Sequence, residues 1–163
     1  MNSKQVLAAV SAVVLIFILV YPAVSTGTVA VSISSAKIQK ADHVYVTVNS
    51  VWAHTTAGVW KLVANNTEKI DLISLENSSQ LLGSGQIPTG AYDSVRIMVS
   101  NVTWVFNKTT TVIGIASPEI DGSVEFTVGA SKETSVLIML SSHEELIANS
   151  EYYAGTMNAT LTG

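Results

Sequence analysis

The sequence predicts an all-β protein: a β-sandwich with immunoglobulin-like or Greek-key connections, preceded by an N-terminal hydrophobic helix. Apolar and polar residues alternate along about eight short segments, and turn residues separate these segments at short intervals. Beyond the N-terminal helix, only residues 142–149 have a helical pattern, because Ser142 and Glu145 form a capping box ahead of Leu146. The sandwich is expected to span residues 43–163.

Residues 1–25 are predicted to direct export, as a signal peptide or as a membrane anchor. Lys4 supplies a positive charge, and residues 6–20 are almost entirely apolar. Small residues stand at Ala23 and Ser25, so we expect cleavage after Ser25. Retention as an anchor is an alternative, because residues 5–24 could just cross a thin bilayer with snorkelling ends. A type IV pilin leader, in which the apolar helix is kept, is a third possibility.

Residues 26–42 are predicted to form an N-terminal strand followed by a polar tether. Val29, Val31 and Ile33 alternate with small residues, which is the pattern of a half-buried strand. This strand could begin its own sandwich. It could also act as a donor strand that fills a groove in a neighbouring copy and pairs with an open edge there.

The next segments predict a strand and a hairpin. Residues 44–48 contain three valines that point to one side of a strand, and Trp52 is expected on the same side. Residues 55–58 end in a turn glycine, and the returning strand is expected over residues 59–63. A short apolar segment follows at residues 70–75.

The glycine-rich segment 83–90 gives the densest turn signal in the chain and is expected to form a loop. Beyond it, two sets of alternating apolar residues, within 95–99 and 102–106, are separated by a step of three instead of two. Such a slip requires a β-bulge or corner near Ser100 and Asn101. Further strands are expected at residues 111–116, 123–128, 135–140 and 156–161.

Five sites have the sequence Asn-X-Ser/Thr, the acceptor for N-linked glycosylation. A chain with this content of Asn, Ser and Thr would have about two such sites by chance. Because this modification marks the surface of secreted proteins, the excess predicts a glycoprotein displayed outside the cell. The candidate acceptors are Asn65, Asn77, Asn101, Asn107 and Asn158. Asn101 and Asn107 are expected on the solvent face of one strand.

The composition narrows the classes of partner. The 163 residues include no cysteine, and charged side chains make up only 12 % of the chain, with a net charge of −4. Without disulfides the fold must depend on core burial, sheet pairing or association. No basic cluster is present, so nucleic acid is not expected as a partner. A surface rich in Ser, Thr and Asn does not titrate, which suits an acidic exterior.

No group of side chains in the sequence suggests catalysis or a cofactor. His43, His54 and His143 lack metal-ligand spacing, and there are no cysteines to complete a site. The segment around Ser84 lacks the Gly-X-Ser-X-Gly pattern of a nucleophile elbow. We therefore expect no catalytic residue, no metal, no cofactor and no enzymatic activity.

The tryptophans are candidates for a carbohydrate-binding surface, because sugar rings stack on indole rings. The strand phases place Trp52 and Trp104 in the core, and Phe106 is expected there as well. Trp60 stands two residues after a turn glycine and is the one ring expected to be exposed.

Four short segments occur in a distinctive order: Val44-Tyr45-Val46-Thr47-Val48, Gly58-Val59-Trp60, Asp71-Leu72-Ile73-Ser74-Leu75 and Gly90-Ala91-Tyr92-Asp93-Ser94-Val95-Arg96-Ile97. Together they resemble a domain-of-unknown-function family of secreted β-sandwich proteins, which is common in archaea and in bacterial lipoproteins. The resemblance implies that the Trp and Tyr residues hold core and corner positions and that no catalytic site accompanies them. The Asp-containing turn that usually follows the family's first strand is replaced here by Ser34-Ser35-Ala36-Lys37.

The leader, the sequon-rich sandwich and the absence of cysteine also resemble archaeal thread filament subunits. That resemblance implies head-to-tail assembly, in which the N-terminal strand of one copy completes the sheet of the next. We therefore expect a structural subunit of an extracellular, glycosylated, pilus-like filament, assembled through Val29, Val31 and Ile33 and serving adhesion or cell–cell contact. The alternative is a membrane-anchored monomeric module that recognises glycan through Trp60 or the 83–90 loop. Either protein would be exported to the cell surface.

Overall fold

The computed structural model describes residues 25–142, 152–153 and 155–162. The predicted N-terminal helix lies outside these residues, and so does the helix predicted at 142–149, apart from Ser142, which ends a strand. Within the described ranges, no helix is long and apolar enough to cross a membrane.

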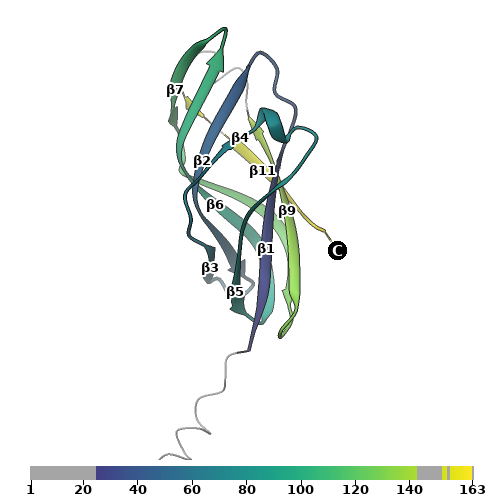
Figure 1. Cartoon of the computed structure of the whole chain (residues 1–163). Helices are drawn as coiled ribbons and strands as arrows, with labels where there is room; N and C mark the ends of the chain where they lie inside the picture. Colours follow the sequence, from purple (N-terminus) through teal and green to yellow (C-terminus); the bar gives the residue numbers. More distant parts are fainter. Residues whose placement is uncertain (1–24, 143–151, 154, 163) are drawn as a thin grey trace, which may run out of the picture.

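The described residues form two β-sheets packed face to face (Figure 1), which confirms the predicted β-sandwich. One sheet has four strands in the order β11-β9-β1-β5. The other has seven, with the main path β10-β7-β6-β2-β3, while β4 pairs with β2 and β8 pairs with β6. The elements are β1 (Thr26–Ser35), β2 (His43–Thr55), β3 (Trp60–Ala64), β4 (Glu68–Asp71), the 3₁₀ helix η1 (Ile73–Leu75), β5 (Gln80–Pro88), β6 (Gly90–Phe106), β7 (Thr109–Ile115), β8 (Glu119–Val128), β9 (Glu133–Ser142), β10 (Tyr152–Tyr153) and β11 (Gly155–Leu161).

The chain crosses repeatedly between the two sheets. β1 begins in the four-stranded sheet, β2 to β4 build the other sheet, and β5 returns to pair with β1. β6 to β8 then complete the seven-stranded sheet before β9 comes back to the other side of β1. As a result β1 is an inner strand, antiparallel to β5 and parallel to β9.

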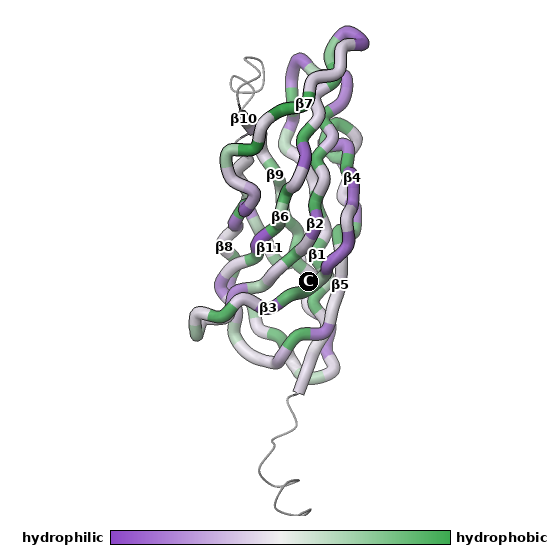
Figure 2. The backbone as a smooth tube through the Cα atoms, turned by 90° about the vertical axis from the view of Figure 1, so that its left-hand side faces the viewer, coloured by the Kyte–Doolittle hydropathy of each residue, from purple (hydrophilic) through white to green (hydrophobic). Residues whose placement is uncertain are grey.

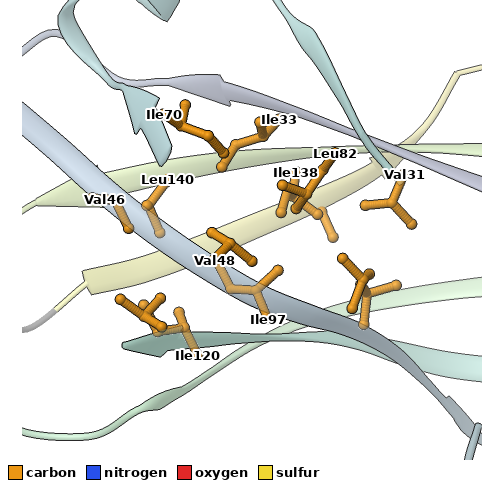
Figure 3. Close-up of a cluster of buried hydrophobic side chains, with 14 of the residues drawn as sticks. Val31, Ile33, Val46, Val48, Ile70, Leu82, Ile97, Ile120, Ile138 and Leu140 are labelled. Atoms are coloured by element: carbon orange, nitrogen blue, oxygen red, sulfur yellow. The ribbon is translucent and has the colours of Figure 1, made fainter. Parts of the chain in front are cut away.

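The core follows from alternation along the strands, which is unbroken in β1. In β1, Val29, Val31 and Ile33 are completely buried, whereas the residues between them are half-buried on the outer face. Figure 2 shows the same alternation as short green and pale stretches along the chain. In Figure 3, Val31 and Ile33 lie in one cluster with buried side chains of both sheets, including Ile138 of β9 and Ile70 of β4.

The predicted bulge in the long strand β6 is confirmed. Thr47 of β2 pairs with Asn101, and the next residue, Val48, pairs with Val99, so that Ser100 is an extra residue in the register with β2. The bulge keeps the residues on both sides of it, Val99 and Val102, inside the core.

A second bulge lies opposite, in β2, and it places Trp52 on the face opposite to the predicted one. Val48 and Ser50 pair with consecutive residues of β6, which leaves Asn49 as an extra residue. This insertion directs Val51 into the core and turns Trp52 to the outer face, where it is half-buried. The prediction that Trp52 lies in the core is therefore wrong, because it assumed an unbroken alternation.

The glycine-rich segment 83–90 is mostly strand β5, so the prediction of a loop is wrong. Only Thr89 separates β5 from β6. A β-carbon on Gly85 would overlap the carbonyl of Val63 in β3, so glycine is needed here for a close crossing of two backbones. A glycine marks a turn or a close approach of another strand, and its local sequence does not distinguish the two.

The predicted positions of the aromatic residues of β6 are partly confirmed. Tyr92 is buried, its ring stacks on Phe126 with 5.2 Å between ring centroids, and its hydroxyl donates to the Pro88 carbonyl at 2.7 Å. This is the corner role that the resemblance implied. Trp104 is in the core as predicted, but Phe106 is 44 % exposed because it ends β6 at the turn into β7.

Candidate functional site

The predicted assembly strand lies inside this chain's own sandwich. Residues 26–33 of β1 pair with β5, and residues 28–35 pair with β9, so both backbone edges of the strand are in use. Val29, Val31 and Ile33 fill the space between the sheets (Figure 3 labels the last two).

The segment that follows β1 is also held against the sandwich. Ile38 is 6 % exposed, and its backbone N–H donates to a carboxylate oxygen of Glu76 at 2.8 Å. The N–H of Ala36 donates to the carbonyl of Leu140 at 3.0 Å. The expected polar tether is therefore packed over part of its length.

All five candidate glycosylation sites have exposed asparagines. The β3–β4 connection carries Asn65, the segment after η1 carries Asn77, β6 carries Asn101, the β6–β7 turn carries Asn107 and β11 carries Asn158. In one of these sites the hydroxyl of Thr103 donates to the Oδ1 atom of Asn101 at 3.1 Å. This hydrogen bond uses the amide oxygen and not the amide nitrogen, which is the atom that would carry the sugar. Exposure is what an acceptor asparagine requires, and whether each site is occupied stays a prediction.

The ring of Trp60 is not a bare platform. It is half-buried on the outer face of the seven-stranded sheet, and the His54 ring lies 4.7 Å from it, centroid to centroid. The Arg96 guanidinium lies over the Trp60 ring at 4.2 Å, within the range of a cation–π interaction. The three side chains come from β3, β2 and β6, three neighbouring strands.

Arg96 connects this aromatic group to β8. Its guanidinium forms two hydrogen bonds to Asp121, at 2.6 and 2.8 Å, and an ion pair with Glu119. The hydrogen bonds that Arg96 donates to Asp121 raise the pKa of Arg96 further above its ordinary value, so the group stays charged. The two carboxylates, which look like ordinary turn acids in the sequence, thus neutralise a cation in the middle of the face.

Beside this group lies an open depression of about 560 Å³, which we call the His54 depression. Its lining residues are His54, Asp93, Ser94, Ser123, Val124 and Glu125. His54 Nδ1 lies 2.7 Å from Asp93 Oδ1, and the Ser94 hydroxyl donates to the same oxygen at 3.0 Å. The hydrogen bond from His54 lowers the pKa of Asp93, so the carboxylate is ionised at neutral pH.

Nothing in the local sequence predicted this grouping. His54 and Asp93 are 39 positions apart and meet only through the β2–β6 register, in which His54 pairs with Ser94. A second pair of the same kind, His43 with Asp71 at 2.7 Å, lies at the other end of β2 and is outside the depression. Among the described residues, no group of three or more His, Cys, Asp or Glu side chains could hold a metal ion.

Comparison with known proteins gives a family but no annotated relative. Neither the curated proteins nor the solved structures include a match to this chain. A family model described as a domain of unknown function, DUF4382, matches residues 26–156, from the first residue of β1 into β11. The match covers the sandwich and more than half of the chain, so the protein belongs to the DUF4382 family of domains of unknown function.

Proposed function

We propose that this chain is an exported structural protein of the cell surface that carries N-linked glycans, and that it is not an enzyme. The observation that supports the proposal most is the exposure of all five sequon asparagines, each in a different connection or strand of the sandwich. Asn101 and Asn158, the two that lie within strands, both face outward, where a sugar can be attached. The apolar segment 6–20 supports export.

The glycan part of the proposal is tested on protein isolated from its own cells. Intact-mass analysis before and after enzymatic or chemical deglycosylation should show a loss of mass, and each Asn→Gln change at an occupied sequon should remove one increment. A mass equal to that of the bare polypeptide would contradict the proposal.

We further propose that copies assemble into an adhesive filament by donation of β1. The strand fills a slot between β5 and β9, and a copy whose own β1 is withdrawn would offer that slot to the β1 of its neighbour. Burial of Val29, Val31 and Ile33 would contribute about 5–9 kcal/mol to each junction. Because the same contacts form within one copy and between copies, chain connectivity and local concentration decide between the closed and the donated form.

An engineered disulfide distinguishes these two forms, since the chain has no cysteine of its own. Ala30 of β1 and Ser84 of β5 are antiparallel partners, at a spacing that a disulfide can bridge. In the A30C/S84C protein at the cell surface, strand donation should give a ladder of covalent oligomers on a non-reducing gel. Oxidised monomer alone would contradict strand donation, and the A30C protein is the matched control for random cross-linking.

The second candidate function is a membrane-anchored monomeric surface module that recognises glycan. The observation that favours it is the pairing of β1 within its own sheet, together with the buried position of Ile38 in the segment that would have to extend for donation. Oxidised monomer in the cysteine experiment would support this candidate.

A further inference from the structure

We propose that the His54 depression is a binding site for the hydroxyl groups of a neutral saccharide. The inference rests on the glycan recognition in the second candidate function, since it gives that recognition a site and a class of ligand. It does not depend on how copies of the chain assemble.

The arrangement of His54 and Asp93 leaves polar atoms available for a ligand. His54 Nδ1 donates to the ionised Asp93, so the ring is fixed and Nε2 is the nitrogen left for another partner. Asp93 Oδ1 accepts from both His54 and Ser94, which leaves Oδ2 as the less occupied oxygen. The side chains of His54 and Asp93 are 25 % and 39 % exposed, so solvent and ligand can reach them.

The other lining residues add acceptors, hydroxyl groups and a small apolar wall. Glu125 supplies a second carboxylate and Ser123 a second hydroxyl, and between them Val124, which packs against the core, adds a small apolar part of the lining. A sugar presents adjacent hydroxyls that donate to carboxylates and accept from serines, and it also presents C–H groups that pack on apolar surfaces. The lining matches both kinds of surface.

The charge of the depression disfavours anionic ligands and makes simple cations a weaker fit than a neutral sugar. Its lining contains two carboxylates and no lysine or arginine, so phosphate, carboxylate ligands and nucleic acid are disfavoured. Arg96, which lies on the same face, is neutralised by Asp121 and Glu119. A simple cation is a weaker fit, because Asp93 is already compensated by two hydrogen bonds at one oxygen.

The neighbouring Trp60 ring restricts the position of the His54 side chain at one edge of the site. Its ring contacts His54 and lies under Arg96, which is itself fixed to β8, so the imidazole is supported from behind. An open depression bordered by fixed side chains on a sheet face suits the end or the side of an extended glycan.

The test is saturation-transfer NMR on the full-length chain, produced without glycosylation and kept in a detergent that has no sugar headgroup. The probes are glucose, mannose, galactose and N-acetylglucosamine, with methylammonium as a cationic competitor. We expect signal from at least one sugar, and binding at least about tenfold weaker in Asp93→Asn, since a hydrogen bond to a charged group is lost. Asp71→Asn, which changes the matched histidine–aspartate pair outside the depression, should bind like the parent.

Glu125→Gln is the second variant, because its exposed side chain can change without affecting the core, and weaker sugar binding in it supports the site. Sugar binding that is equal in the parent, Asp93→Asn and Glu125→Gln overturns the site. The second candidate function would then stand, with the glycan bound elsewhere on the chain. The absence of signal from every sugar overturns both the site and the second candidate function. Displacement of a bound sugar by millimolar methylammonium overturns the assignment to a neutral ligand.

Discussion

Gly85 in β5 lies so close to Val63 in β3 that a β-carbon on the glycine would overlap the valine carbonyl oxygen. The two strands belong to different sheets, and this contact closes one side of the sandwich. At a neighbouring position, a β-carbon on Gly83 would overlap the side chain of Ala64. Two glycines at alternate positions thus bring the edges of the sheets together where side chains would hold them apart.

Replacement of Gly85 by Ala should therefore destabilise the fold. Because the obstructing atom is backbone and cannot rotate away, we expect a loss of about 1–3 kcal/mol in the free energy of unfolding, or more. Urea unfolding followed by tryptophan fluorescence measures the change. Ser84→Ala is the control, because Ser84 is exposed, and it should change stability by less than about 0.5 kcal/mol. Equal stability of the two variants would show that β3 and β5 can separate without cost.

Truncation of Ile33 tests the contribution of β1. The side chain is completely buried between the sheets, so Ile33→Ala should reduce the free energy of unfolding by about 2–5 kcal/mol. Ser32→Ala, on the outer face of the same strand, is the matched control and should have little effect. Near-parental stability of Ile33→Ala would mean that β1 does not pack in the sandwich of its own copy or of a neighbour.

Tyr153 makes the fold sensitive to alkali. Burial raises the pKa of its hydroxyl to about 12 from an ordinary value of 10.0, with only partial relief from the Ser142 hydroxyl at 3.3 Å. The neutral hydroxyl is favoured in the folded protein, so its stabilising contribution is complete below pH 10 and is lost as the pH rises towards 12. The linkage amounts to about 2–3 kcal/mol. Chemical unfolding at pH 9 and pH 11.5 should show a steeper loss in the parent than in Tyr153→Phe; parallel losses would contradict this origin.

Asp93 has the opposite pH dependence. The hydrogen bond from His54 lowers its pKa, so its stabilising contribution is present above the ordinary carboxyl pKa and is lost as the pH falls through the lowered value. The melting temperature of the parent should fall below pH 4 by more than that of Asp93→Asn. The effect should be small, because the pair is solvent-exposed and the chain has few charged groups. A large loss of stability between pH 7 and pH 3 would contradict the idea that this surface suits an acidic exterior.

Alternation along the chain was sufficient to predict the sandwich, because each strand has one core face. It also located the bulge at Ser100, since a step of three in the apolar pattern is visible in a single strand. The bulge at Asn49 left no such mark, because Val48, Val51 and Trp52 are all apolar and fit two phases equally well. That ambiguity placed Trp52 on the wrong face.

The candidate site was beyond the reach of local patterns for a related reason. Trp60 was identified because it follows a turn glycine, but its partners His54 and Arg96 depend on the register of three strands. The His54–Asp93 pair likewise needs the β2–β6 alignment, which two bulges modify. Short motifs predict elements, whereas sites on a sheet face require the alignment between elements.

The parallel pairing of β1 with β9 also determines when the protein can fold. The first strand of the domain has no partner on that side until more than a hundred further residues have followed, since Thr28 pairs with Glu133. Contacts that span most of a chain form slowly, so the polypeptide stays unfolded for longer than one built from local hairpins. Under the export proposed above, a translocation channel that accepts only extended chains would receive this one in a suitable state, and the sandwich would close after the last strands had crossed.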